Sequence, residues 1–580
     1  MLQVFSYLKP YRKPMIIAIS LMLMELAVEL IHPLLIAKII DDGIIQQDMS
    51  VVWYWGGIML LLTLLGFAAG IINSFYAATV SQGFAYDIRE SMFGRIQSFS
   101  FANFDRFATS SLITRITSDV TQMQNVVFMG LRIMLRAPLM LMGGLIMAMV
   151  INVKLGLILL VTMPFLFGFL VWVMNRGFKL FRAVQARLDR TNGVLRENLM
   201  GMRLIKAFVR SKHEMGRFSK ANGELRDKTI AALRLIELAI PILLLVMNFS
   251  ILFILWFGNN QVNAANADIG QIVAVVNYAT RITGAFTALS FILASISRAR
   301  ASAQRVGEVL ATEEDMVEKR EDSSRKNHDE GEIVFDNVTF QYPRSQSPAI
   351  DAVSFRVRSG QTVAILGATG SGKSTLFQLI PRLYDPQEGR ILINGTDVRE
   401  LTYATLRRQI GYVPQESLLF TGTVQDNIRW GKEGASAEEV REAAANAQIH
   451  ETIMKLPKQY ETLIGQKGVN LSGGQKQRMS IARALIRKPR FLLFDDSTSA
   501  LDLATEAKLL QALKKYDCTT LIITQKISTA IEADTVLLME DGRLLAQGTH
   551  DELLASSSLY RQIVESQFGK EGTSDAKTAR

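Results

Sequence analysis

The stretch Gly367-Ala-Thr-Gly-Ser-Gly-Lys373-Ser374 decides the fold of the second half of this chain. It follows an apolar, strand-like run from Thr362 to Leu366 and leads into a helix-like segment, Ser374-Thr-Leu-Phe-Gln. Glycines let backbone amides surround a chain of phosphates, and the following helix points its positive end at them. Lys373 can reach the terminal phosphates, and the Ser374 hydroxyl can ligate Mg²⁺. The stretch therefore predicts a nucleoside triphosphate site, against the alternative of a glycine-rich turn without a ligand.

Further segments of the second half suit the same site. Phe491-Leu-Leu-Phe-Asp495 has the pattern of a buried strand that ends in a carboxylate on the Mg²⁺ side. Leu471-Ser-Gly-Gly-Gln475 opens a helix, so its amides offer another anion site. Gln415 follows an expected strand, and Tyr342 can stack on a base. From Ile333 onward, short β-rich runs alternate with helical stretches, which predicts an α/β domain.

Composition indicates a second, membrane-embedded part. The 580 residues exceed one ordinary domain, and 49% of them are hydrophobic. The mean hydropathy of +0.19 is high for a soluble protein, and the apolar runs lie in the first half. The single cysteine, Cys518, excludes an internal disulfide framework and fits a reduced cytosolic domain. Much of the net charge of +10 lies in loops beside the apolar runs, so we expect no nucleic-acid partner.

Six membrane spans are predicted in the first half. A crossing needs roughly 20 residues, and six runs reach that length: 15–40, 52–80, 131–151, 155–174, 236–257 and 269–296. The loops 41–50 and 258–268 contain no Lys or Arg, whereas the segments after the second and fourth spans are rich in both. Both termini and the second half are therefore expected in the cytoplasm.

The first span contains three ionisable residues on one helical face. Glu25, Glu29 and His32 are spaced by four and three residues. Ionisable groups at membrane depth should face protein or a wet cavity. Two interpretations stay open: a cavity wall that attracts cationic or amphipathic cargo, or structural pairing with another helix, for example at Arg281.

The expected domain organisation has four parts. Residues 1–312 form an all-α transmembrane domain of six helices, and 331–570 form an α/β P-loop nucleotide-binding domain. The charged segment 313–330 reads as a linker, and 571–580 as a disordered tail. The long basic segments between spans either continue the helices and transmit movement or are only solvated charged faces.

These motifs, in this order and spacing, resemble the ATP-binding cassette family, specifically exporter-type half-transporters with the membrane domain first. The resemblance covers nearly the whole chain and implies ATP and Mg²⁺ as cofactors. It also implies that 110–120 and 211–218 are coupling helices, which favours transmission by the basic segments. The residues that it implies are Tyr342 for adenine; Gly367, Thr369, Gly370, Ser371, Gly372, Lys373, Ser374 and Thr375 for phosphates; Ser374, Gln415 and Asp495 for Mg²⁺; Ser472, Gly473, Gly474 and Gln475 for a partner's ATP; and Asp502 in the D-loop.

Two positions depart from the family pattern. Asp496 stands where the family has its catalytic glutamate, and Gln525 stands where it has the switch histidine. The aspartate carboxylate is one methylene shorter, and a misplacement of about 1 Å can cost about 100-fold in rate. Glutamine cannot become a cation. We therefore expect nucleotide binding to survive and hydrolysis at this site to be slow.

In the family, ATP lies between two cassettes, so one cassette cannot close a site alone. The chain resembles the degenerate-site subunits of bacterial heterodimeric multidrug exporters, through Asp495-Asp496 and Ile523-Thr-Gln-Lys-Ile527. The resemblance implies a second half-transporter with consensus glutamate and histidine, a bacterial cytoplasmic membrane, and a hydrophobic or amphipathic cargo. The alternatives are a homodimeric exporter or lipid flippase, and a regulatory subunit that binds ATP without pumping.

Overall fold

The computed structural model describes residues 2–264, 266–313, 316, 331–343 and 345–575. The chain divides into two compact units. The first comprises Met1–Gln97 and Thr109–Thr312, and the second comprises Ser98–Ala108 and Glu313–Arg580. Each unit is described separately below.

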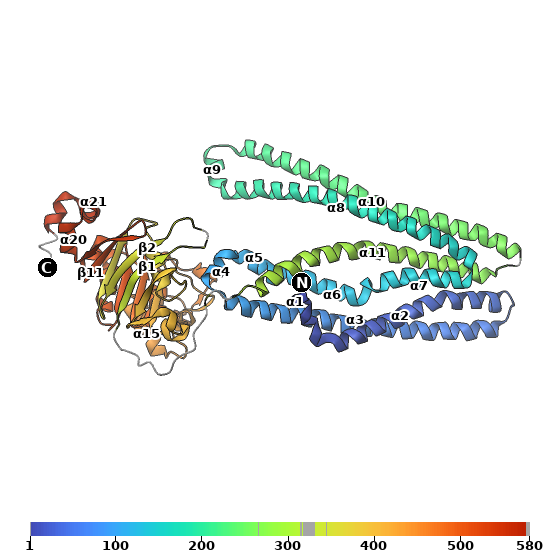
Figure 1. The fold of residues 1–580 in the computed structure, drawn as a ribbon, viewed down its shortest axis with the longest axis horizontal. Helices are drawn as coiled ribbons and strands as arrows, with labels where there is room; N and C mark the ends of the chain where they lie inside the picture. The colour runs from blue at the N-terminus through green and yellow to red at the C-terminus, as the bar shows by residue number, and fades with distance from the viewer. Residues whose placement is uncertain (1, 265, 314–315, 317–330, 344, 576–580) are drawn as a thin grey trace. The chain divides into compact units, whose positions relative to one another are not determined.

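The first unit is all-helical. Among its described residues, six helical stretches are long and apolar enough to cross a membrane, which confirms the predicted number of spans. In Figure 1, α8 and α10 lie side by side and are joined through α9. The helices are α1 (Leu2–Phe5), η1 (Ser6–Tyr11), α2 (Arg12–Lys38), η2 (Ile39–Ile44), α3 (Met49–Gln97), α5 (Thr109–Thr114), η3 (Arg115–Asp119), α6 (Val120–Met129), η4 (Gly130–Met134), α7 (Arg136–Ile151), α8 (Val153–Met200), α9 (Met202–Ala207), α10 (Ser211–Asn263) and α11 (Ile269–Leu310).

The outward faces of these helices carry large apolar side chains. Phe67, Phe75 and Trp256 are all more than half exposed. Such apolar faces suit contact with lipid tails. A helix can make this contact because its backbone N–H and C=O groups are hydrogen-bonded within the helix. Pro164 lies inside α8 and Pro241 inside α10, positions that membrane helices tolerate.

The second unit is built on three sheets and surrounding helices. A six-stranded sheet has the order β12-β11-β3-β10-β9-β6, in which β12 is the antiparallel edge. A four-stranded sheet has the order β2-β1-β4-β5, and β7 pairs with β8. The strands are β1 (Ile333–Phe340), β2 (Ile350–Val357), β3 (Thr362–Gly367), β4 (Glu388–Ile393), β5 (Thr396–Asp397), β6 (Ile410–Val413), β7 (Gly422–Thr423), β8 (Leu463–Ile464), β9 (Phe491–Asp495), β10 (Thr519–Ile523), β11 (Thr535–Glu540) and β12 (Arg543–Gly548).

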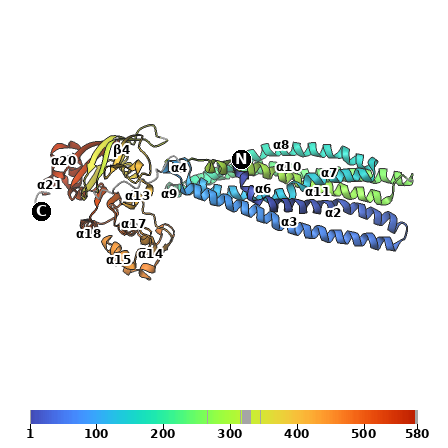
Figure 2. The ribbon, with the colours of Figure 1, turned by 60° about the horizontal axis from the view of Figure 1, so that its bottom comes forward.

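Helices α14 to α18 of this unit form a region with its own hydrophobic core. Figure 2 shows α14, α15, α17 and α18 gathered together, apart from β4. The helices are α4 (Phe101–Arg106), α12 (Lys373–Leu379), η5 (Val398–Glu400), α13 (Tyr403–Arg408), α14 (Val424–Arg429), α15 (Ala437–Asn446), α16 (His450–Met454), η6 (Gln459–Glu461), η7 (Gln466–Gly468), α17 (Gly473–Leu485), α18 (Leu503–Leu513), α19 (Ile527–Ile531), α20 (His550–Ser556) and α21 (Ser558–Asp575).

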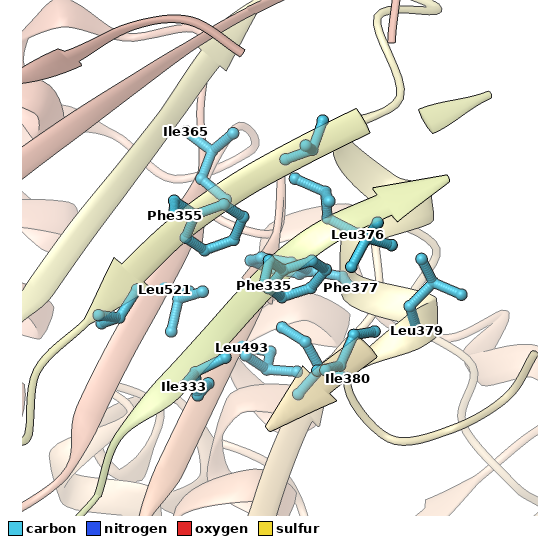
Figure 3. Close-up of a cluster of buried hydrophobic side chains, with 14 of the residues drawn as sticks. Ile333, Phe335, Phe355, Ile365, Leu376, Phe377, Leu379, Ile380, Leu493 and Leu521 are labelled. Carbon is cyan, nitrogen blue, oxygen red and sulfur yellow. The ribbon is translucent and has the colours of Figure 1, made fainter. Parts of the chain in front are cut away.

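A second core positions the helix that follows the phosphate loop. In Figure 3, Phe335 of β1 lies beside Leu376 and Phe377 of α12. Phe335 also stacks on Phe355 of β2, with ring centroids 4.5 Å apart. Both faces of β3 are buried as well. Because strand and helix are both held by packing, the loop between them has defined ends.

The observed boundaries differ from the expected ones at α4. Residues 98–108 belong to the second unit, although the sequence placed them in the transmembrane domain. The expected coupling segment 110–120 lies in the first unit, and 211–218 is part of the long helix α10. The expected linker lies almost wholly outside the described residues, as do positions 576–580, while α21 extends to Asp575.

Candidate nucleotide site

The phosphate loop connects β3 to α12 and requires glycine at two points. Gly372 has a φ of +92°, and a Cβ there would lie 2.4 Å from the carbonyl oxygen of Ala349. Gly367 has a φ of +154°, and a Cβ there would lie 2.2 Å from the carbonyl oxygen of Met539. Any side chain at either position would clash with backbone. The predicted loop geometry is therefore set by close backbone approach on both sides.

Lys373 is buried and folded over this loop. Its Nζ donates hydrogen bonds to the carbonyl oxygens of Gly367 at 3.0 Å and Ala368 at 2.7 Å, and to Ser371 Oγ at 3.3 Å. Burial lowers the pKa of Lys373, and the neighbouring carboxylates of Asp496 and Asp495 oppose that shift. The ammonium group is thus held where the loop would receive phosphates.

Two residues expected at the Mg²⁺ side are in direct contact. Ser374 Oγ donates a hydrogen bond to Asp495 Oδ1 at 2.8 Å. Asp495 is buried at the end of β9, which lies next to β10 and two strands from β3. Burial raises the pKa of Asp495, while bonds from Ser374 and Tyr412 and the charge of Lys373 lower it.

A hydroxyl and one carboxylate suit Mg²⁺, which usually takes few protein ligands and completes its shell with water and substrate phosphates. No cluster of three or more His, Cys, Asp or Glu residues occurs among the described residues, so an all-protein cage is not the arrangement found there. Ser374 and Asp495 would hold Mg²⁺, and the ion would supply positive charge that stabilises the phosphates. The roles of Ser374 and Asp495 as ligands stay predictions. Gln415 follows β6, and its side chain is exposed.

Tyr412 is a member of this site that sequence reasoning missed. Its hydroxyl donates a hydrogen bond to Asp495 Oδ2 at 3.3 Å. Tyr412 lies on β6, and β6 pairs in parallel with β9, which places the two side chains near each other. Burial and the carboxylate of Asp495 both raise the pKa of Tyr412. The sequence offered only the neighbouring Gln415 as a signal.

Asp496 has an unusual backbone at the base position. Its φ is +45°, in the left-handed region, and its N–H donates to the carbonyl oxygen of Ile523 at 3.1 Å. Ser499 Oγ donates to the carbonyl oxygen of Asp496 at 2.9 Å. Burial, then repulsion from Asp495, raises the pKa of Asp496, while Lys373 and Lys526 lower it. Non-glycine residues in this region concentrate at functional sites.

The switch position is followed by a lysine that attaches the D-loop. Gln525 is exposed, and its carbonyl oxygen accepts from Gln567 Nε2 at 2.6 Å. Lys526 Nζ donates to the carbonyl oxygens of Thr498 at 3.1 Å and Leu501 at 3.2 Å. It also pairs with the buried Glu506 at 2.5 Å. Neither Lys526 nor Glu506 was identified as a site residue from the sequence, because no local pattern joins them.

The signature residues form the exposed start of α17. Ser472 Oγ accepts from the Gln475 N–H at 3.4 Å, and Gln475 Oε1 accepts from the Ser472 N–H at 2.8 Å. This capping box orients a helix start, including Gly473 and Gly474, whose first amides have no partners within the helix. Within the described residues, no hydrogen bond or ion pair joins 472–475 to 367–375.

Asp502 begins the helix after the D-loop. Its carboxylate accepts from the N–H of Thr505 at 2.9 Å and from its Oγ1 at 2.8 Å. These bonds lower the pKa of Asp502. Ala500 N–H donates to Gln477 Oε1 at 3.3 Å, so the D-loop also contacts the signature helix.

Tyr342, expected beside adenine, packs next to the phosphate-loop helix. Its hydroxyl donates to Gln378 Oε1 at 2.9 Å and lies 3.2 Å from Thr375 Oγ1. Its ring meets Tyr384 edge-on, with centroids 5.4 Å apart. The Tyr384 hydroxyl donates to Asp105 of α4 at 2.9 Å. The stacking role stays a prediction, but the contacts connect Tyr342 with α4 inside the second unit.

The acidic face of the first span is paired with arginines. Arg136 contacts Glu25 at 3.0 Å and Glu29 at 2.7 Å, and Arg281 contacts Glu29 at 3.1 Å. His32 Nε2 lies 3.1 Å from Thr63 Oγ1. The structure therefore shows the structural pairing of these glutamates with other helices, including the suggested Arg281. It also shows Arg136 as a partner, which the sequence reasoning missed.

Comparison with known proteins agrees with this architecture. Residues 15–286 match the ABC transporter transmembrane region, and residues 350–499 match the ABC transporter family. The ABC transporter ATP-binding protein YfiB of Bacillus subtilis is 58% identical over 573 residues, covering 99% of this chain and all of that protein. The putative multidrug export ATP-binding/permease protein YgaD of the same organism is 33% identical, covering 96% of this chain and 97% of that protein.

The fold is also found in a solved structure. A bacterial Atm1-family ABC exporter with ATP bound superposes with a TM-score of 0.79 at 26% identity, over 96% of this chain and 98% of the other. The two family models, the relatives matched over nearly the full length and the solved structure all identify the same family. This chain therefore belongs to the ABC transporter family and has the fold of an Atm1-type exporter.

Proposed function

We propose that this chain is one subunit of a heterodimeric, ATP-driven exporter of lipophilic compounds in a bacterial cytoplasmic membrane, with both termini in the cytoplasm. The exporter fold and the similarity to a putative multidrug export protein support this proposal. The charge distribution of the loops supports the orientation.

One observation supports the asymmetry: the phosphate-loop motif is complete, whereas two positions depart from the family pattern. Lys373 is folded over the phosphate loop, and Ser374 donates a hydrogen bond to Asp495, which supports a role for these residues in binding ATP. Asp496 and Gln525 replace the family's glutamate and histidine. This chain would bind ATP at its own phosphate loop, hydrolyse it slowly, and present Ser472–Gln475 to the ATP of a partner with a consensus site.

The transport cycle follows from this division. ATP binding would close the two cassettes against each other, and hydrolysis at the partner's consensus site would reopen them. On this chain, Lys373 would orient the phosphates, and Asp495 would hold Ser374 in position. Asp105, which bonds Tyr384, would link the nucleotide-binding unit to the chain segments on either side of α4.

ATPase activity of the co-purified pair tests the assignment. Asp496→Asn should change turnover by less than about threefold, whereas neutralising the partner's catalytic glutamate should lower it by about 100-fold or more. Equal losses would contradict the asymmetric assignment. Brisk ATP hydrolysis and transport by this chain alone would instead favour a homodimeric exporter or flippase. ATP binding by a pair that moves no cargo would favour a regulatory subunit.

A further inference from the structure

A cavity of about 420 Å³ lies within the first unit, bounded by α2, α3, η4, α7 and α11. Its charged lining consists of Glu25, Glu29, Arg132, Arg136 and Arg281. Its apolar lining includes Phe67 and Ile71 of α3, whose side chains are 68% and 42% exposed. The cavity thus combines a charged wall with an apolar wall, which suits an amphipathic ligand.

The two acidic side chains of this cavity are already neutralised. Glu25 pairs with Arg136, and Glu29 pairs with both Arg136 and Arg281. Three arginines therefore face two glutamates, and the lining carries an excess positive charge when His32 is neutral. A cationic ligand would have to displace an arginine from its carboxylate. An anionic ligand would not.

Arg132 provides the unsatisfied charge. It lies on η4 within the third membrane-spanning stretch and is half-buried. Among the residues that the structure describes, it forms no ion pair and no hydrogen bond. A guanidinium cannot lose its proton in a protein, and an ionisable side chain in a membrane span usually has a partner. An anion supplied from outside the described chain would give Arg132 the ion pair that it lacks there.

We propose that this cavity binds the anionic headgroup, a carboxylate or a phosphate, of an amphipathic cargo, with Arg132 as its contact residue. The cargo's apolar part lies against Phe67 and Ile71. This inference rests on the proposed export function and specifies its substrate class. It replaces the cationic cargo that the acidic face of the first span suggested, because the arginines that reverse the charge come from distant helices.

Binding of matched probes to the full chain in phosphatidylcholine nanodiscs tests the proposal. The probes are 11-(dansylamino)undecanoate and analogues of the same length that end in an alcohol or a trimethylammonium group. Energy transfer from tryptophan to dansyl gives each Kd. We expect the carboxylate to bind about tenfold or more tightly than either analogue, the size of effect that one charge-assisted contact gives.

Variants locate the contact. Arg132→Gln should bring the carboxylate within about threefold of the alcohol, whereas Arg132→Lys, which keeps the charge, should retain most of the preference. Glu25→Gln should strengthen carboxylate binding, because it releases part of Arg136. The matched control is Arg176→Gln on α8, away from the cavity lining, which should behave like the unmodified chain.

Each outcome decides the proposal. Equal affinities for the three probes, or tighter binding of the trimethylammonium probe, would overturn the anionic class. An intact preference in Arg132→Gln would overturn the role of Arg132. Nanodiscs that contain phosphatidylglycerol separate two sources of the anion: displacement of the probe assigns the site to a lipid headgroup, and its retention to a soluble amphiphile. Since no ATP is used, this test can fail while ATP-driven transport by the pair still holds.

Discussion

The phosphate-loop edge and the signature edge of the nucleotide-binding unit differ in how far their polar groups are buried and hydrogen-bonded. Lys373 and Asp495 are buried and bonded to their own loop and to Ser374. Ser472 is exposed, and its only role within the described chain is to cap α17. The first edge has groups desolvated in advance for a ligand, whereas the second is an open helix start. This difference supports the proposal that the second edge contacts ATP held by a partner subunit.

The largest expected effect is a loss of ATPase activity after substitution of Ser472 at the signature edge. Ser472→Arg fills the helix start with a bulky cation, so the proposed pair should lose about 100-fold or more of its ATPase rate. Turnover of the co-purified pair is the measurement. Ser436→Arg is the matched control, because Ser436 forms the same kind of exposed capping box at the start of α15. Equal losses of ATPase rate in both variants would mean that damaged helix capping alone explains the effect.

A second prediction concerns the attachment of the D-loop between the two edges. Lys526→Met removes the cation that holds Thr498, Leu501 and Glu506, and leaves the buried Glu506 carboxylate without an ion-pair partner. We expect a loss of about 2 kcal/mol in local stability, seen as faster amide exchange in residues 496–505. Lys526→Met combined with Glu506→Leu should recover part of that loss. Unchanged exchange in the single variant would show that packing alone holds the loop.

A third prediction concerns Asp496 at the phosphate-loop edge, whose side chain is one methylene shorter than the glutamate of the family. Asp496→Glu should raise hydrolysis at this chain's own site by about tenfold, because the longer carboxylate reaches further toward the attacking water. The rate is measured in pairs whose partner site has been inactivated. Asp541→Glu is a suitable control, since Asp541 also has a positive φ, of +45°. No gain would mean that Gln525 or the left-handed backbone limits the reaction instead.

The smallest effect concerns the two adjacent carboxylates. Burial raises the folded-state pKa of Asp496 above its usual value, so its charge lowers stability at neutral pH. This penalty is fully present above the folded pKa and disappears as pH falls below the unfolded one. Asp496→Asn should therefore raise the free energy of unfolding of the nucleotide-free chain at pH 8 by less than about 1 kcal/mol, measured as a higher thermal midpoint. The gain should shrink on acidification, and a gain that grows at low pH would contradict the shift.

The prediction from sequence succeeded where a short pattern implies a structure. The phosphate loop, the buried strand ending at Asp495 and the number of membrane spans all follow from local order: glycine spacing, apolar runs and their length. It did not foresee that residues 98–108 of the first half group with the second unit. Residues 98–108 carry no distinctive pattern, and their place depends on partners such as Tyr384, which lies 279 positions from Asp105.

The sequence by itself determined that this chain has six membrane spans and an ATP-binding cassette with altered residues at positions 496 and 525. Those features are local, because lipid thickness, backbone clashes and residue identity act within a few positions. Only the tertiary structure decided that Arg136 neutralises Glu25 and Glu29, that Arg132 has no ion pair with any described residue, and that Lys526 holds the D-loop. Charge pairing is decided by distance in space, and helix packing brings together residues more than 100 positions apart.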